Sequence, residues 1–193
     1  MFSFLGFFAV LFLLISSFVA KVEVNTDINL YHDYMGSSAK EEYRDKWEMN
    51  EDIFPKKITN TMKVLDYKMV YYNPWDAQYL SYLIVQYNED DFLTEVSRLE
   101  EYGINEYLGY YSVTGFSKYH LLAMEADSYN GFIYAITDGK DKIIYVELIF
   151  CNYFYDLDYL DYIEEEYLPD GFDATIDNLY KKEMMDLSAE MVM

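Results

Sequence analysis

The side chains best suited to chemistry in this sequence are the carboxylates of one acidic run, between residues 156 and 166. Carboxylates that alternate along a loop can hold a hard cation such as calcium, because calcium binds several oxygen ligands at once. The spacing therefore identifies one set of candidate metal ligands: Asp156, Asp158, Asp161 and Glu164.

The same run departs from a calcium-binding loop when Asp156 is taken as its first position. Leu160 stands where the loop needs an oxygen ligand, Asp161 where it needs glycine, and Tyr167 where it needs glutamate. The pattern favours a solvated acidic surface, with weak calcium binding as the alternative, and no other cofactor is expected.

Catalytic motifs are absent from the sequence. The two histidines, His32 and His120, are too far apart for a local zinc motif. His120 follows Ser117 closely, but the residues around that serine do not form the G-x-S-x-G turn of a nucleophile. No glycine-rich phosphate loop occurs either. We therefore assign no catalytic residue, and a hydrolase that uses carboxylates, with or without a metal, remains the alternative function.

Aromatic side chains form the second candidate site. The chain holds 23 tyrosines, 13 phenylalanines and 2 tryptophans, so aromatic rings must occupy both its core and its surface. A group of them surrounds the turn at residues 73–76 and could stack on a sugar or a protein partner: Tyr71, Tyr72, Trp75 and Tyr79. The alternative is that these rings pack on the sheet and the helices.

The charge of the chain restricts its partners. Its 35 acidic and 14 basic side chains give a formal net charge of −21, and residues 1–20 contribute none of it. Such a surface repels phosphate backbones and anionic lipid headgroups, so the charge excludes nucleic-acid binding. Cations, cationic proteins and neutral ligands remain possible partners.

The first twenty residues indicate a membrane. Residues 2–20 form an uninterrupted apolar run long enough to span a bilayer, which predicts either a cleaved signal peptide or an uncleaved anchor helix. Lys21 alone would favour a cytoplasmic C-terminus, but such leaders usually export the domain behind them, so we expect the rest of the chain to be extracytoplasmic. The single cysteine, Cys151, excludes an intramolecular disulfide and is interpreted as a small buried hydrophobe.

The hydrophobic periods predict the elements that would position these residues. Alternation with a period of two, or a continuous apolar run, predicts strands near 64–72, 79–87, 119–127, 132–137 and 142–151. A helix capped by Asn88 is expected over 89–102, with Leu93 widening its buried stripe. A final amphipathic helix with Leu179 in its apolar stripe is expected over 174–185, covering the sheet, and a helix of about three turns is expected after Ser38. Asn130-Gly131 predicts a type I′ turn between two of the strands.

These elements predict an α+β fold: an antiparallel or mixed sheet of about five strands, a helix packed after the second strand, and a C-terminal helix. The expected organisation is a signal or anchor at 1–20, a linker with a short helix at 21–60, an acidic domain at 61–187 and a frayed tail at 188–193. The most favoured function is a membrane-tethered or secreted, non-enzymatic binding module.

Overall fold

The computed structural model describes residues 20–36 and 38–191. The apolar leader expected at residues 2–20 lies outside the described residues, apart from Ala20. Within the part of the chain that is described, no helix has both the length and the apolar character needed to cross a bilayer.

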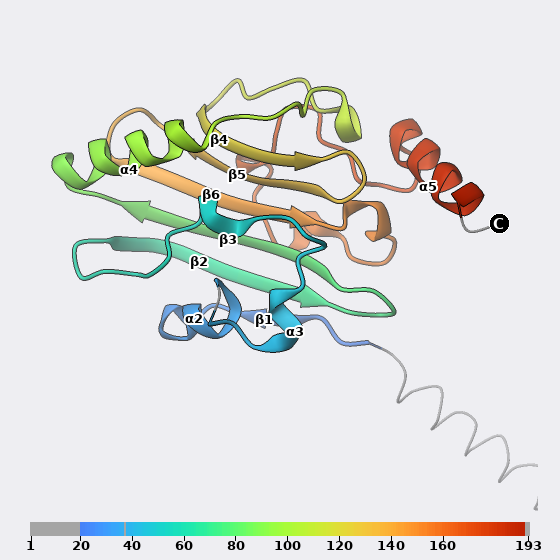
Figure 1. Cartoon of the computed structure of the whole chain (residues 1–193), viewed down its shortest axis with the longest axis horizontal. Coiled ribbons are helices and arrows are strands. Elements are labelled where there is room, and N and C mark those ends of the chain that lie inside the picture. Colours follow the sequence, from blue (N-terminus) through green and yellow to red (C-terminus); the bar gives the residue numbers. More distant parts are fainter. Residues whose placement is uncertain (1–19, 37, 192–193) are drawn as a thin grey trace, which may run out of the picture.

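The centre of the molecule is one antiparallel sheet of six strands (Figure 1). Its strands are β1 (Glu23–Asn25), β2 (Lys63–Tyr72), β3 (Gln78–Gln86), β4 (His120–Asp127), β5 (Gly131–Thr137) and β6 (Lys142–Ile149). The α+β class and the five longer strands are confirmed. The sixth, β1, has three residues, which is too short to show a hydrophobic period.

The strand order β1-β2-β3-β6-β5-β4 joins two simple units. The hairpin of β2 and β3 pairs antiparallel through β3 with β6, the last strand of the β4–β5–β6 meander. The central strands are apolar on both faces because both faces are covered: every residue of β5 is buried, and so is all of β3 except its last residue.

The turn before β5 differs from the expected two-residue turn at Asn130-Gly131. The carboxylate of Asp127 accepts hydrogen bonds from the backbone N–H groups of Tyr129, at 2.9 Å, and Asn130, at 2.6 Å, and Gly131 is the first residue of β5. Gly131 has a φ of 128°, and a Cβ there would lie 2.3 Å from the carbonyl oxygen of Leu148. Only glycine fits this position.

Helix α4 (Glu89–Tyr102) follows the hairpin, as expected. The side chain of Asn88 accepts a hydrogen bond from the backbone N–H of Asp91 at 3.0 Å, and Gly103, with a φ of 89°, ends the helix. Leu99 is fully buried. Leu93, which we expected to widen the buried stripe, is 58 % exposed, so that part of the prediction is wrong.

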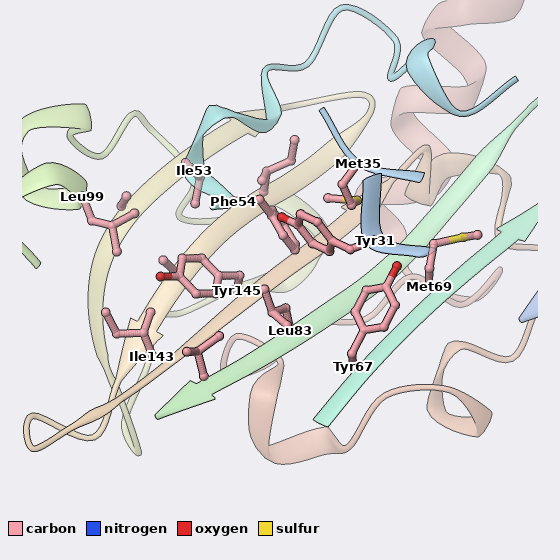
Figure 2. Packing of buried hydrophobic residues seen from close by; sticks show 14 of the residues in the cluster. Tyr31, Met35, Ile53, Phe54, Tyr67, Met69, Leu83, Leu99, Ile143 and Tyr145 are labelled. Atoms are coloured by element: carbon pink, nitrogen blue, oxygen red, sulfur yellow. The ribbon is translucent and has the colours of Figure 1, made fainter. Parts of the chain in front are cut away.

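The segment 21–60, expected to be a linker with a short helix, contributes β1 to the edge of the sheet, and its described residues from 28 onward form a layer packed on one face of the sheet. Figure 2 shows Tyr31, Met35, Ile53 and Phe54 from this segment above side chains of β2, β3 and β6. Its helices are single turns, α2 (Tyr31–Tyr34) and α3 (Glu41–Arg44).

The helix of three turns predicted after Ser38 is wrong. Helix α3 begins at Glu41 and ends at Arg44. The backbone of Trp47 and Glu48 then takes left-handed φ values of 54° and 65°, which no α-helix can continue through.

The opposite face of the sheet is covered by residues 107–116 and by the segment 150–178, which is built largely of turns and short 3-10 helices. Tyr111, Phe154, Leu168 and Ala174 are buried against this face. The sheet is therefore the middle of three layers: α4 and the N-terminal segment cover one face, and turns with short 3-10 helices cover the other.

The C-terminal helix α5 (Leu179–Met191) begins later than predicted and does not cover the sheet. Figure 1 shows it beyond the end of the strands, and its principal contacts are with the turns at residues 110–112 and 151–153. Leu179, expected in its buried stripe, is 80 % exposed, whereas Lys181 is fully buried. The helix continues through Met191, past residue 187, where the sequence predicted a frayed tail.

Candidate functional site

The four aromatic residues predicted as a binding patch lie on two faces of the sheet. Successive residues of a strand point to opposite sides, so Tyr71 and Tyr72 separate. The Tyr71 ring lies 5.4 Å from that of Tyr79, beside the N-terminal layer. The Tyr72 hydroxyl reaches the other side and donates a hydrogen bond to Asp156. Trp75 lies at the tip of the turn between β2 and β3.

A concave site lies on one side of this turn. We call it the aromatic hollow, and it has a volume of about 520 Å³, which is within the range of small-ligand sites. Its lining includes Trp75, Asp76 and Gln78 from the turn and the start of β3, and Tyr153, Tyr155 and Asp156 from the segment after β6. Trp75 is 90 % exposed.

One wall of the aromatic hollow is held by a stack of rings. The rings of Trp47 and Phe150 stack with centroids 4.1 Å apart, and those of Phe150 and Tyr153 with centroids 4.4 Å apart. The ring of Tyr155 then meets Tyr153 edge-on at 5.6 Å. The indole N–H of Trp47 donates to the carbonyl of Ala77 at 2.7 Å, which ties the stack to the turn opposite.

Backbone strain accompanies this stack. Trp47 and Phe150 both have left-handed backbones, with φ values of 54° and 67°. Such conformations cost roughly 1–3 kcal/mol at a residue other than glycine, and they persist only where the surrounding packing fixes them. The three stacked rings come from segments about a hundred residues apart in the chain. No local pattern could have predicted that they meet.

The charged groups that line the aromatic hollow are carboxylates, which accept hydrogen bonds. Gln78 is only 2 % exposed, and among the described residues nothing donates a hydrogen bond to its Oε1. Asp156 accepts a hydrogen bond from Tyr72, and burial and that hydrogen bond raise the pKa of Tyr72 to about 12. Of the described residues that line the hollow, none is basic.

Lys181 lies behind the aromatic hollow. Its ammonium is 4.9 Å from the centroid of the Tyr155 ring and donates hydrogen bonds to the carbonyls of Phe154, at 3.1 Å, and Ala174, at 2.7 Å. Burial lowers the pKa of Lys181 to about 8. This lysine anchors α5 to the loop that forms the wall, which explains why the most deeply buried side chain of the helix is a polar one.

A second, shallower hollow lies on the other side of the same turn. It has a volume of about 550 Å³, and we call it the acidic hollow because its lining includes Glu41, Glu42 and Asp45 beside Tyr71 and Tyr79. The predicted aromatic residues thus do not form one surface. Tyr71 and Tyr79 line the acidic hollow, and Trp75 lines the aromatic hollow.

The four carboxylates predicted as calcium ligands are engaged separately. Asp156 lies at the aromatic hollow, and Asp158 accepts a hydrogen bond from the backbone N–H of Leu160 at 3.1 Å. Asp161 ends one short 3-10 helix and Glu164 precedes the next. Across residues 20–36 and 38–191, no three histidine, cysteine, aspartate or glutamate side chains are grouped so as to hold a metal ion.

The residues considered for hydrolysis are likewise not assembled. His120 is exposed at the start of β4. Ser117 donates a hydrogen bond to Asp170 at 3.1 Å, but in the described structure no hydrogen bond joins His120 to either of them. Cys151 is buried and donates to the carbonyl of Leu148 at 3.3 Å, and burial raises the pKa of its thiol.

A buried charged cluster connects the N-terminal layer to the middle of the sheet. The ammonium of Lys46 lies 3.0 Å from Oε1 of Glu147, on β6, and 3.7 Å from Oε2 of Glu51. It also lies 4.3 Å from the centroid of the Tyr79 ring. One cation faces two carboxylates here, and burial, followed by the charge of Glu147, raises the pKa of Glu51, against the opposite pull of Lys46.

Comparison of the chain with protein-family models, with curated protein sequences and with solved structures gives no match.

Proposed function

We propose that this chain is a non-enzymatic binding module that holds its ligand in the aromatic hollow beside the β2–β3 turn. The observation that carries the proposal is the exposure of Trp75, which is 90 % exposed and lines the same hollow as Tyr153 and Tyr155. A large apolar ring at the tip of a turn contributes little to the core. Aromatic rings of this kind are the usual anchors of binding surfaces when a ligand covers them.

The rigidity of the site supports the same function. The ring stack of Trp47, Phe150 and Tyr153 fixes one wall, and the sheet register fixes the base, where Gln78 pairs with Tyr72. A site held this firmly loses little side-chain entropy when a ligand binds. The hydrolase alternative lacks such support, since the described part of the chain groups no three histidine, cysteine, aspartate or glutamate side chains that could hold a metal ion.

The proposed location follows from the sequence. We propose that residues 2–20 carry the module across a membrane and either anchor it there or are removed. A C-terminal alkaline phosphatase fusion should then be active. A C-terminal fluorescent protein that matures in the cytoplasm would contradict this location, and N-terminal sequencing would decide between cleavage and anchoring.

Binding is tested with probes of three kinds: a neutral oligosaccharide, a cationic peptide and an anionic peptide. Each is titrated into the full chain in a non-ionic detergent by isothermal calorimetry, which needs no tryptophan signal. We expect at least one probe to lose its binding in Trp75→Ala and keep it in Leu179→Ala, a matched control because Leu179 is an exposed apolar residue on α5. If no probe depends on Trp75, the proposed function is wrong.

A further inference from the structure

The aromatic hollow offers acceptors and no donors from charged side chains, which restricts the chemistry of its ligand. Gln78 contributes a buried carbonyl oxygen that no described residue satisfies, and the carboxylates of Asp76 and Asp156 lie at the rim. That oxygen is shielded from solvent, so the charged groups that a ligand in the hollow can reach are the two carboxylates, which only accept hydrogen bonds when ionised. The carboxylates therefore favour a ligand that donates hydrogen bonds.

The rings add a second restriction. Trp75 is 90 % exposed, so the faces of its ring are open to a ligand, and a flat cation stacks on such a ring through both dispersion and cation–π attraction. The loop already holds one cation in this way, since the ammonium of Lys181 lies 4.9 Å from the Tyr155 ring centroid. The Lys181 ammonium donates its hydrogen bonds to two carbonyls. Asp156 accepts a hydrogen bond from Tyr72, and among the described residues neither Asp76 nor Asp156 has a cationic partner.

The charge of the surroundings gives the third restriction. The aromatic hollow and the acidic hollow flank one turn and together carry five carboxylates, and no basic residue is among the described residues that line either hollow. The chain as a whole has a net charge of −21. A cation is attracted to such a surface over a distance of about a Debye length, roughly 8–10 Å at physiological salt, whereas a neutral ligand gains nothing from it.

We propose that the group held in the aromatic hollow is the guanidinium of an arginine side chain on a partner protein, an inference that rests on the proposed function. A guanidinium is flat, positively charged and rich in N–H donors, so it satisfies all three restrictions together. A quaternary ammonium has no donor for the carboxylates of Asp76 and Asp156. A lysine ammonium has donors but no flat face, and a sugar has donors and a stacking face but no charge.

The acidic hollow would allow the chain to recognise a longer segment of the partner protein than one arginine. Glu41, Glu42 and Asp45 lie on the far side of the same turn and suit a second basic side chain of the partner. The arginine in the aromatic hollow supplies the geometric specificity, and the acidic hollow adds an electrostatic contribution that salt screens.

The test compares two peptides that differ only in charge, acetyl-Ala-Arg-Ala-amide and the same peptide with citrulline, the neutral isostere of arginine. Both are titrated into the full chain by calorimetry, with cellotetraose as a neutral stacking probe. We expect the arginine peptide to bind at least about tenfold more tightly than the citrulline peptide, because cation–π attraction and the carboxylates are lost together.

Variants locate the binding. Trp75→Ala should weaken binding of the arginine peptide about tenfold, and Asp156→Asn should weaken it about threefold. Glu100→Gln, which removes a charge from the exposed side of α4, should leave the affinity for the peptide unchanged. Circular dichroism checks that each variant is folded. Equal binding of the two peptides, or tight Trp75-dependent binding of cellotetraose alone, overturns the arginine assignment and leaves the binding module intact. Binding of no probe through Trp75 overturns both proposals.

Discussion

The ammonium of Lys46 lies 3.0 Å from Oε1 and 3.1 Å from Oε2 of Glu147, although the two residues are 101 positions apart in the chain. Both side chains are buried, and Glu147 lies on β6 between Ser81 of β3 and Ile133 of β5. This pair fastens the N-terminal layer to the centre of the sheet.

Removing only the cation of this pair should strongly destabilise the fold. Lys46→Met leaves Glu147 and Glu51 buried without their counter-charge, so we expect the free energy of unfolding to fall by roughly 3–5 kcal/mol in urea titrations. The double variant Lys46→Met with Glu147→Leu should be less damaged than the single one. Lys56→Met is the control, because Lys56 pairs with Asp52 at the exposed surface, where such pairs are worth about 1 kcal/mol or less. Equal losses in the single and double variants would contradict this account.

Glu51 should make stability depend on pH. Its pKa is raised in the folded state, so the folded chain holds this proton more tightly than the unfolded chain does. The contribution of Glu51 is therefore most favourable below the pKa of the unfolded chain, and it is lost as the pH rises through the folded pKa. We expect Glu51→Gln to remove this decline in unfolding experiments from pH 4 upward. Glu100→Gln should keep the wild-type profile, and a wild-type profile in Glu51→Gln would refute the assignment.

Replacing Gln78 should raise the stability of the fold and weaken ligand binding. Its buried Oε1 has no donor in the described structure, so Gln78→Met, which keeps the shape and removes the acceptor, should raise the free energy of unfolding by about 1 kcal/mol. The same variant should weaken the binding of any ligand whose affinity depends on Trp75. Thermal melts and calorimetry on one preparation measure both effects. A variant that loses stability would show that the amide is satisfied within the fold.

Salt should stabilise the chain without a specific effect of calcium. At a net charge of −21, the folded state is weakened by self-repulsion that added salt screens. Asp156 and Asp158 already accept hydrogen bonds from Tyr72 and from the backbone of Leu160. We therefore expect millimolar calcium to raise the melting temperature no more than sodium chloride of equal ionic strength. A calcium increment lost in Asp156→Asn with Asp158→Asn would establish a metal site instead.

The elements with a clear period were predictable, and those fixed by distant partners were not. The alternation from residue 64 and the Asn88 cap correctly predicted β2 and α4. Ser38, by contrast, has the spacing of a helix cap, but the chain turns at Trp47 and Glu48, where the ring of Trp47 stacks on Phe150. A contact between residues so far apart overrides local preference and has no signal in the local pattern.

The candidate site was likewise predictable from the sequence only in part. The turn with Trp75 stood out in the sequence because aromatic residues cluster there. Its opposite wall did not, because Tyr153 and Tyr155 lie in a segment without a helical or strand period. Lys181 was missed for a related reason: a lysine in an acidic tail resembles a surface residue until its carbonyl acceptors are known.

The ring stack determines when the aromatic hollow forms during folding. Trp47, Ala77, Phe150 and Tyr153 must all be in position before the two walls of the aromatic hollow face one another. The hairpin that carries Trp75 can form from local contacts, but the opposite wall comes after β6, whose pairing with β3 closes a loop of more than fifty residues. A chain still being synthesised therefore displays the tryptophan before the hollow exists, and the binding proposed above requires the residues that follow β6 to be in place.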